Sequence, residues 1–373
     1  LGTWAWAHAQ TDFSEPGTAL MLTATMLASV RWWQRPSPRA AALVGLLVGC
    51  AAITRSSVLA FIPVLLLMGL AARPGTAMPA RAKELVAFCA GGVLPGVAFT
   101  LNAYLRFGSP LDNGYPPLAF NTPIYEGVFG QFLSSGKGMF WYAPITIVAF
   151  FAVRQAYLAQ RRYVVTLGLL LAVHLAVYGR FVIWSGENAY GPRYMVPVLP
   201  LCIVVLAPVI DSGRQWARSV KVAGIAGFIG PGLLGSLMYF NAVYWHTQSD
   251  INRNLQLETF EAHQLYIAWD FQPRSSPLIL HVHSLDALLD NTIDRLQGQP
   301  GGITDMPENF EDRIHWYARA IELDAWWAWW PVKNGPGEAY ALLLVPLACL
   351  VGGGLLARSN VVRARSARNE TVV

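Results

Sequence analysis

Apolar runs separated by short polar loops recur along most of this sequence, and they constrain the fold more than any other feature. A helix needs about 20 apolar residues to cross the hydrocarbon core of a bilayer. Nine runs approach that length, so the sequence predicts an all-α polytopic membrane protein with about nine transmembrane helices. The runs lie near residues 17–33, 40–54, 56–72, 84–105, 140–153, 163–183, 194–210, 222–245 and 338–357.

The composition excludes an ordinary soluble enzyme. Only 13% of the residues are charged and 54% are hydrophobic, whereas about 25% of a typical soluble domain is charged. Aromatic residues make up 12%, as expected of a chain with many membrane–water interfaces. The formal net charge of +5 does not indicate nucleic acid as a partner, because the cations follow the membrane topology.

Lysine and arginine gather in every second loop, as the positive-inside rule requires of cytoplasmic loops. This pattern places the N-terminus and the loops between the basic ones outside the cytoplasm, and a basic tail inside. Because the chain begins with Leu1, we expect a missing upstream part with an odd number of spans. The basic segments, residues 31–39, 73–83, 154–162, 214–221 and 358–368, hold 16 of the 27 cations.

Three regions follow from this topology. Residues 1–245 form a transmembrane domain, and residues 246–337 form a roughly 90-residue extracytoplasmic, α-rich segment. That segment ends in four tryptophans within residues 326–330, which are typical of an interfacial anchor. Residues 338–373 hold the last helix and the basic cytoplasmic tail.

The extracytoplasmic loop at 184–193 carries the densest set of polar groups. It contains Glu187, Asn188, Tyr190 and Arg193 between two apolar runs. The planar fork of an arginine at this membrane surface suits a phosphate or a carboxylate. The alternative is that Glu187 and Arg193 pair with each other and only fasten the turn.

Two further cations lie at predicted outer ends of spans. Lys137 stands between two glycines, where an anion can approach it closely, and Arg55 separates two short apolar runs. An ionisable residue at membrane depth is a functional candidate because burying it is costly. The alternatives are a lysine and an arginine that reach for lipid headgroups.

Two carboxylates, Asp12 and Glu15, precede Pro16 and the first apolar run. They are secondary site candidates. A purely structural role is also open, since acidic side chains at this distance commonly cap a helix N-terminus.

Three motifs resemble the bacterial membrane glycosyltransferases of the GT-C superfamily, which include relatives of protein O-mannosyltransferases and lipid A aminoarabinose transferases. The motifs are N-x-Y-x-R-F-G-S-P from residue 102, S-x-G-K-G-x-F-W-Y-x-P from residue 134, and W-x-G-x-x-x-Y-G-P-R-Y-x-x-P-x-L-P from residue 184. The resemblance covers roughly residues 1–245.

The resemblance implies an inverting transfer of a hexose or pentose from a polyprenyl-phosphate donor to an extracytoplasmic glycan, lipid or protein at the bacterial cytoplasmic membrane. It also implies that the usual catalytic carboxylate lies upstream of residue 1. It names no cofactor and leaves a divalent metal open. The implied roles are Glu187, Asp12 and Glu15 for catalysis; Arg193, Lys137 and Arg55 for the donor phosphate; and Asn188, Tyr190, Asp112 and Tyr115 for the sugar or acceptor.

Two other function classes stay open. A transporter or flippase of a lipid-linked sugar predicts charged residues inside spans and internal pseudo-symmetry. A non-catalytic membrane scaffold has no need of four polar residue types in one tight turn. The transferase hypothesis accounts best for polar groups that gather on one side of the membrane.

Overall fold

The computed structural model describes residues 3, 5–9, 14–70, 78–110, 112, 120–186, 189–210, 214–238, 240, 242–244, 270–297 and 321. The chain divides into two compact units, Leu1–Glu322 and Leu323–Val373, and all described residues belong to the first. Every regular element among them is a helix, with no β-strand in those ranges. The all-α fold class is therefore confirmed for this part of the chain.

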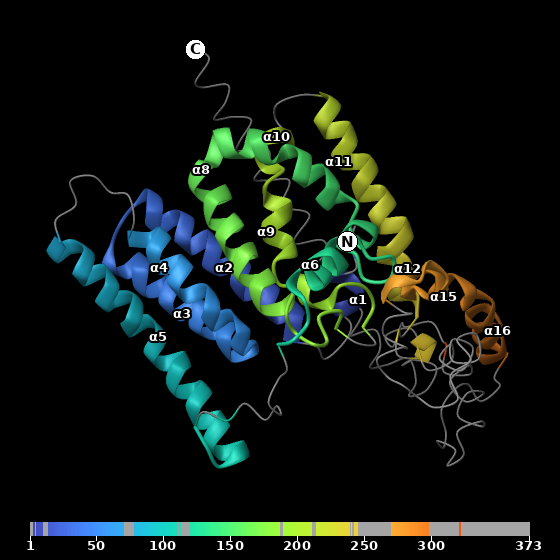
Figure 1. Cartoon of the computed structure of the whole chain (residues 1–373), viewed down its shortest axis with the longest axis horizontal. Coiled ribbons are helices and arrows are strands. Elements are labelled where there is room, and N and C mark those ends of the chain that lie inside the picture. Colours follow the sequence, from blue (N-terminus) through green and yellow to red (C-terminus); the bar gives the residue numbers. More distant parts are fainter. Residues whose placement is uncertain are drawn as a thin grey trace. The chain divides into compact units, whose positions relative to one another are not determined.

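The elements follow one another along the chain as Figure 1 shows. The first half holds α1 (Ala5–Ala9), α2 (Ser14–Gln34), α3 (Pro38–Thr54), η1 (Ser56–Phe61), α4 (Ile62–Leu70), α5 (Met78–Phe107), α6 (Ile124–Leu133), α7 (Met139–Tyr142) and α8 (Ile145–Tyr178). The second half holds η2 (Arg193–Met195), α9 (Leu199–Val204), α10 (Ala207–Ile210), α11 (Arg214–Gly227), η3 (Phe228–Gly232), α12 (Leu233–Leu237), η4 (Pro273–Ser275), α15 (Pro277–His283) and α16 (Leu285–Leu296).

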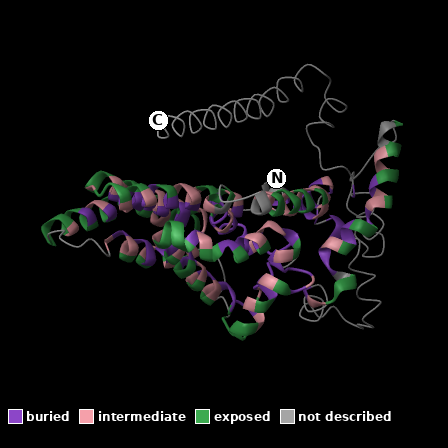
Figure 2. Cartoon of the chain, turned by 90° about the horizontal axis from the view of Figure 1, so that it is seen from above, coloured by how far each residue is buried: buried purple, intermediate pink, exposed green. Residues whose placement is uncertain are grey.

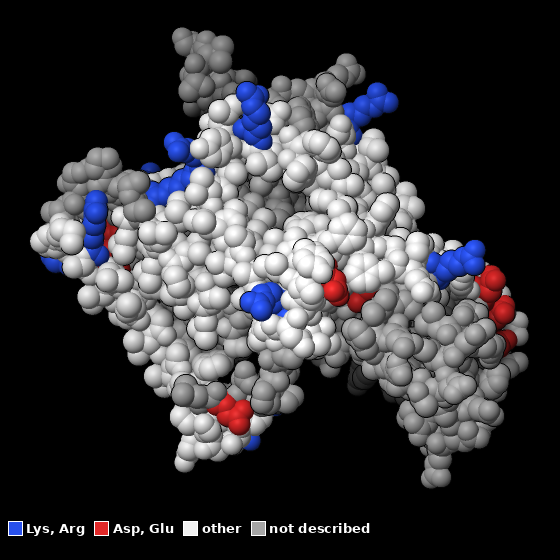
Figure 3. All heavy atoms as spheres, viewed as in Figure 1, with Lys and Arg blue, Asp and Glu red and all other residues white. Residues whose placement is uncertain are grey.

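Three of the described helical stretches are long and apolar enough to cross a membrane. They are Met78–Phe107, Ile145–Tyr178 and Ala217–Leu237, and the shorter apolar stretches Pro38–Thr54 and Ser56–Leu70 accompany them. On the face shown in Figure 3, charged side chains are sparse among the described residues. These features support the sequence-based prediction of a membrane protein with transmembrane helices.

The prediction of nine crossings is not supported by these helices. The run at 40–54 forms α3, which has 17 residues and falls short of the usual spanning length of about 20. The run at 194–210 is divided among η2, α9 and α10, since the prolines within it interrupt a continuous helix. The run at 338–357 lies outside the described residues.

Two of the predicted runs, 140–153 and 163–183, fall largely on the single helix α8. A straight helix of its 34 residues would be about 51 Å long, well beyond a hydrocarbon core of about 30 Å. The helix is not straight, because Gln160 has non-helical backbone angles of φ −143° and ψ 54°. Arg161 and Arg162 follow directly, so the basic segment lies at the bend between two apolar arms.

Contacts among α2, α3, α4, α5 and α8 define two opposite ends of this group of helices. At the end that we term the basic end, Trp32 Nε1 in α2 donates to Glu84 Oε2 in α5 over 2.9 Å. Arg162, beside the α8 bend, donates to a carbonyl in the last turn of α4 at the same end. At the opposite end, the hydroxyls of Thr18 and Thr54 are hydrogen-bonded over 2.9 Å. Basic connections therefore collect at one end, and the opposite end is left for other side chains.

Small residues allow α3 and α5 to approach closely. A Cβ atom at Gly45 would lie 2.0 Å from the Phe88 carbonyl oxygen, and one at Gly91 would lie 2.0 Å from the Ala42 carbonyl oxygen. Close packing over glycine is typical of helices in membranes, where the hydrophobic effect does not drive helices together. The outward face of α5 exposes large apolar side chains, among them Leu94 at 72%. That face is suited to lipid.

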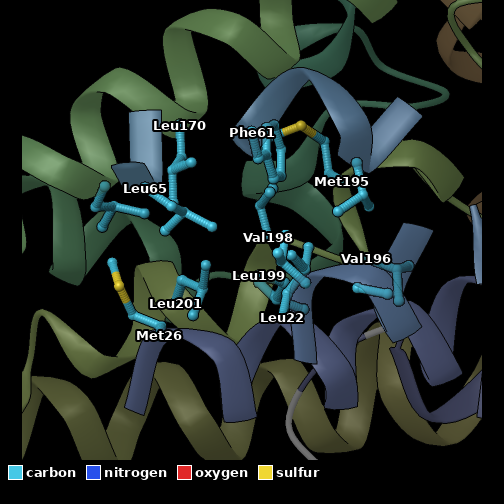
Figure 4. Packing of buried hydrophobic residues seen from close by; sticks show 14 of the residues in the cluster. Leu22, Met26, Phe61, Leu65, Leu170, Met195, Val196, Val198, Leu199 and Leu201 are labelled. Carbon is cyan, nitrogen blue, oxygen red and sulfur yellow. The ribbon is translucent and has the colours of Figure 1, made fainter. Parts of the chain in front are cut away.

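One apolar core joins the helices that meet at the end opposite the basic end. Figure 4 shows side chains from α2, η1, α4, α8 and α9 pointing into a shared interior. In Figure 2 buried residues line the inward sides of the helices and exposed residues line their outer sides. The labelled core residues are Leu22, Met26, Phe61, Leu65, Leu170, Met195, Val196, Val198, Leu199 and Leu201. This packing holds the starts and ends of several helices in fixed positions around the candidate site.

Candidate functional site

A buried glutamate pairs with two arginines at the end opposite the basic end. Glu15 Oε1 accepts hydrogen bonds from Arg55 Nη1 and from Arg193 Nε, the latter over 2.5 Å. The glutamate side chain is 0% exposed, whereas the arginine side chains are 16% and 22% exposed. We term these three residues the arginine cluster. Two positive charges against one negative leave it with a net charge of +1.

Each member of the arginine cluster stands at the end of an element. Glu15 lies in the first turn of α2, where the helix dipole favours a negative charge. Arg55 separates α3 from η1 in an extended conformation, and its N–H donates to the Ala51 carbonyl at the end of α3. Arg193 is the first residue of η2 and follows Pro192 at the N-cap position. Residues 15, 55 and 193 thus meet because the start of α2, the end of α3 and the start of η2 lie together.

Two tyrosines support the arginines from the side. Arg55 Nε donates to the Tyr178 hydroxyl over 2.6 Å, and that hydroxyl is also 2.7 Å from Ser57 Oγ. The Arg55 guanidinium lies 4.7 Å from the ring centroid of Tyr194, which stacks on Tyr178 with centroids 4.5 Å apart. These contacts hold the guanidinium in one orientation by cation–π attraction as well as by hydrogen bonding.

A small cavity lies beneath Arg55. Its free volume is about 10 Å³, close to the least that one water molecule needs. Thr18, Ser57 and His174 line it together with Tyr178. His174 Nε2 has no hydrogen-bond partner among the described residues, so a water molecule here would find polar neighbours.

The charge state of Glu15 follows from its two partners. Burial alone would raise the pKa of the carboxyl, but the positive charges of Arg55 and Arg193 lower the pKa below its ordinary value. The carboxylate therefore stays ionised and accepts protons poorly. It is well suited to hold two guanidiniums together and poorly suited to serve as a general base.

A second set of polar contacts fixes the loop that leads to Arg193. Lys137 is fully buried, and its Nζ donates to the Ala189 carbonyl over 2.5 Å. His8 Nε2 is 2.9 Å from the next carbonyl along, that of Tyr190. Burial lowers the pKa of His8 to about 4, so the imidazole is neutral near pH 7. Two consecutive carbonyls of the loop are thus held from two different elements.

Tyr190 points into the protein rather than toward a ligand. Its side chain is fully buried, and its hydroxyl donates to the Pro231 carbonyl over 2.9 Å. The ring of Tyr142 meets it edge-on at 5.0 Å and the ring of His281 lies 4.6 Å away. In this structure Tyr190 braces the loop, and its role in sugar or acceptor binding stays a prediction.

The sequence motifs did not single out Asp270. This residue is 4% exposed, and its carbonyl accepts from the Gly136 N–H over 2.9 Å. Burial raises the pKa of its carboxyl to about 7, against the opposing effects of Lys137 and of a hydrogen bond from Ser185. The only local signal was an acidic residue between two aromatic ones, Trp269 and Phe271, within a polar segment.

The other predicted site residues divide into two groups. Glu187, Asn188, Asp12 and Tyr115 lie outside the described residues. Asp112 lies on the loop after α5 and is exposed. Among the described residues, Glu15 forms ion pairs with Arg55 and Arg193 alone. The structure thus brings together three candidates, Glu15, Arg55 and Arg193. Capping is not the whole role of Glu15, because its carboxylate also pairs with two arginines.

Within the described ranges, no group of three or more His, Cys, Asp and Glu side chains is placed to hold a metal ion. The H-x-H pair of α15 shows why spacing alone is weak: His281 Nδ1 is 2.7 Å from the Pro277 carbonyl within its own helix. The structure thus does not assign a metal to the arginine cluster.

Comparison with known proteins gives no relative. No protein-family model matches the chain, and neither a curated protein nor a solved structure does. The chemistry of the site therefore has to be argued from the contacts themselves.

Gly186 controls how closely the loop approaches Arg193. Its φ is +82°, and a Cβ atom there would lie 2.7 Å from Arg193 Cβ. We expect Gly186→Ala to lower the free energy of unfolding by about 2 to 3 kcal/mol, because strain in the left-handed region adds to the clash. Equilibrium unfolding in detergent measures this.

The matched control is Gly108→Ala. Gly108 has a similar φ of +76°, but nothing lies within 4 Å of its Cβ position. Gly108→Ala should lower the free energy of unfolding by only about 1 to 2 kcal/mol, from strain in the left-handed region. Equal losses in the two variants would show that the contact with Arg193 does not constrain the loop.

Proposed function

We propose that this chain is a membrane glycosyltransferase that takes its sugar from a polyprenyl-phosphate donor, and that the arginine cluster binds the donor phosphate. The observation that carries the proposal is the pairing of Arg55 and Arg193 on one buried glutamate. The motifs around residues 102, 134 and 184, which resemble GT-C transferases, supply the reaction class.

The arginine cluster has the properties that a phosphate site needs. Guanidinium groups bind phosphate oxygens through charge-assisted, often bidentate hydrogen bonds. Both arginine side chains keep part of their surface open, while the side chain of Glu15 is closed to solvent. The net charge of +1 attracts an anion, and the contacts to Tyr178 and Glu15 reduce the entropy lost when the arginines bind one.

The same cluster would stabilise the leaving group of a sugar transfer. When the bond between the sugar C1 and the phosphate oxygen breaks, negative charge grows on the lipid phosphate. Hydrogen-bond donors that already point at this phosphate lower the barrier most. In this proposal Glu15 positions Arg55 and Arg193, and it is not the base.

The proposal includes a topology. Arg35 after α2, Lys83 in α5 and Arg161 at the α8 bend lie at the basic end, which would face the cytoplasm of a bacterial cell under the positive-inside rule. The arginine cluster would then lie at the extracytoplasmic surface, with membrane lipids around it and an envelope glycan, lipid or protein as acceptor. About nine crossings remain part of this proposal.

The proposed phosphate site is tested by Arg193→Ala. We expect at least a tenfold loss of affinity for undecaprenyl phosphate, since one charge-assisted interaction contributes about 1.5 to 3 kcal/mol. Arg193→Lys keeps the charge but not the fork, and it should recover only part of the affinity. Titration of the purified protein in detergent measures the dissociation constants.

Arg180→Ala is the control, because Arg180 is an exposed arginine at the end of α8. It should bind undecaprenyl phosphate as the unsubstituted chain does. The uncharged polyprenol is the control ligand and should bind weakly to all variants. Equal affinity of Arg193→Ala and the unsubstituted chain for undecaprenyl phosphate would exclude the arginine cluster as the phosphate site.

A further inference from the structure

A second buried polar cluster lies outside the arginine cluster. It consists of Lys137, Ser185 and Asp270, whose relative exposures are 0%, 4% and 4%. The Gly136 N–H donates to the Asp270 carbonyl over 2.9 Å, which fixes residue 270 against the loop that carries Lys137. Three segments distant in the sequence thus enclose one carboxylate.

One oxygen of this carboxylate is left without a partner. Ser185 hydrogen-bonds to the Asp270 carboxylate, yet Oδ1 has no hydrogen-bond partner among the described residues and is closed to solvent. A buried acceptor without a donor costs about 1 to 3 kcal/mol. A hydroxyl group that donated to Oδ1 would recover that free energy, so the position favours a ligand with a hydroxyl.

Ser185 connects the Asp270 carboxylate to the loop that leads to Arg193. Ser185, which contacts Asp270, precedes Gly186, and the Cβ position of Gly186 is 2.7 Å from Arg193 Cβ. His8 provides a second link, since its Nε2 is 2.9 Å from the Tyr190 carbonyl, which follows the Ala189 carbonyl that Lys137 binds. The two clusters therefore contact the same loop.

Asp270 differs from Glu15 in its ability to accept a proton. Glu15 is held as an anion by two arginines, whereas burial raises the pKa of Asp270 to about 7. The charged groups that act on Asp270 are Lys137, which lowers the pKa, and Glu126, which raises it. A base is most effective when its pKa is near the working pH.

We propose that Asp270 is the catalytic base of the transfer and removes the proton from the acceptor hydroxyl. This proposal rests on the proposed transferase function, and it assigns the base to Asp270 instead of the upstream carboxylate that the resemblance implies. The acceptor oxygen attacks the sugar C1 and forms the new glycosidic bond while its proton passes to Asp270. The bond from C1 to the phosphate oxygen breaks, and its electron pair leaves with the polyprenyl phosphate at Arg55 and Arg193.

The test compares Asp270→Asn with the unsubstituted chain, each within the full-length protein and reconstituted in vesicles. Polyprenyl-phosphate mannose is the hexose probe, polyprenyl-phosphate arabinose is the pentose probe, and a native membrane extract supplies the acceptors. Release of polyprenyl phosphate measures transfer. We expect Asp270→Asn to reduce the rate at least 100-fold, the low end for loss of general-base catalysis. Its affinity for undecaprenyl phosphate should stay within twofold.

The pH profile separates a base from a structural residue. The rate of the unsubstituted chain should rise with pH through the Asp270 pKa and then level off, while the residual rate of Asp270→Asn should lack this rise. The control is Asp290→Asn, which removes an exposed carboxylate from α16 and should keep the full rate and profile.

The outcomes distinguish the two proposals. Full transfer by Asp270→Asn alongside an active unsubstituted chain overturns the role of Asp270 and leaves the transferase intact. Loss of undecaprenyl phosphate binding in Asp270→Asn to the same extent as loss of rate also overturns it, because the residue would then be structural. No transfer of either sugar by the unsubstituted chain overturns the proposed function, and the base with it.

Discussion

Glu15→Gln should lower the free energy of unfolding by about 3 to 5 kcal/mol, the range for removal of one partner from a buried ion pair. The substitution keeps the size of the side chain and removes the charge that Arg55 and Arg193 share. Because both guanidiniums are largely buried, water restores only part of the lost interaction. Equilibrium unfolding in detergent at neutral pH measures the loss.

A double-mutant cycle identifies the cause. In the background of Glu15→Gln, Arg193→Gln should cost much less than it does in the unsubstituted chain, since its ion pair is already absent. The control Asp290→Asn removes an exposed carboxylate and should change stability by no more than about 0.5 kcal/mol. If Glu15→Gln unfolds like this control, the three charges do not stabilise one another.

Apolar length predicts where helices lie better than it predicts how many of them cross a membrane. The run at 84–105 appears within α5, and the run at 17–33 appears within α2. Yet α2 carries hydroxyls along its length, and Thr25 Oγ1, for example, donates back to the Met21 carbonyl. The bend at Gln160 falls in the polar segment 154–162 that separates two apolar runs, but local hydropathy does not show that one helix continues through this segment.

Charge at a membrane surface predicted part of the candidate site. Arg55 and Arg193 stood out as cations at the ends of apolar runs, and the structure brings them together. The choice of their counter-ion could not be read from the sequence, since Glu15 is 40 residues from Arg55 and 178 from Arg193. Asp270 was missed because its burial comes from the loop around Gly136, which only the folded chain places beside it.

The Asp270 carboxyl should make stability depend on pH. Burial raises its pKa to about 7 in the folded chain, above the ordinary value of 3.8. A group with a raised pKa contributes stability that is fully present below pH 3.8 and is lost as the pH rises through 7. Each pKa unit corresponds to about 1.4 kcal/mol, so we expect about 2 to 3 kcal/mol of this loss between pH 5 and pH 8.

Asp270→Asn isolates that loss from all other titrating groups. The variant also differs from the unsubstituted chain by a constant amount of unfolding free energy, because Lys137 loses a neighbouring charge. The difference in unfolding free energy between variant and unsubstituted chain should nevertheless move by about 2 to 3 kcal/mol in favour of the variant from pH 5 to pH 8. Asp290→Asn, at an exposed position of α16, should follow the unsubstituted chain at every pH. Parallel curves for Asp270→Asn and the unsubstituted chain would mean that Asp270 does not titrate in this range, and its suitability as a base near pH 7 would fall with that result.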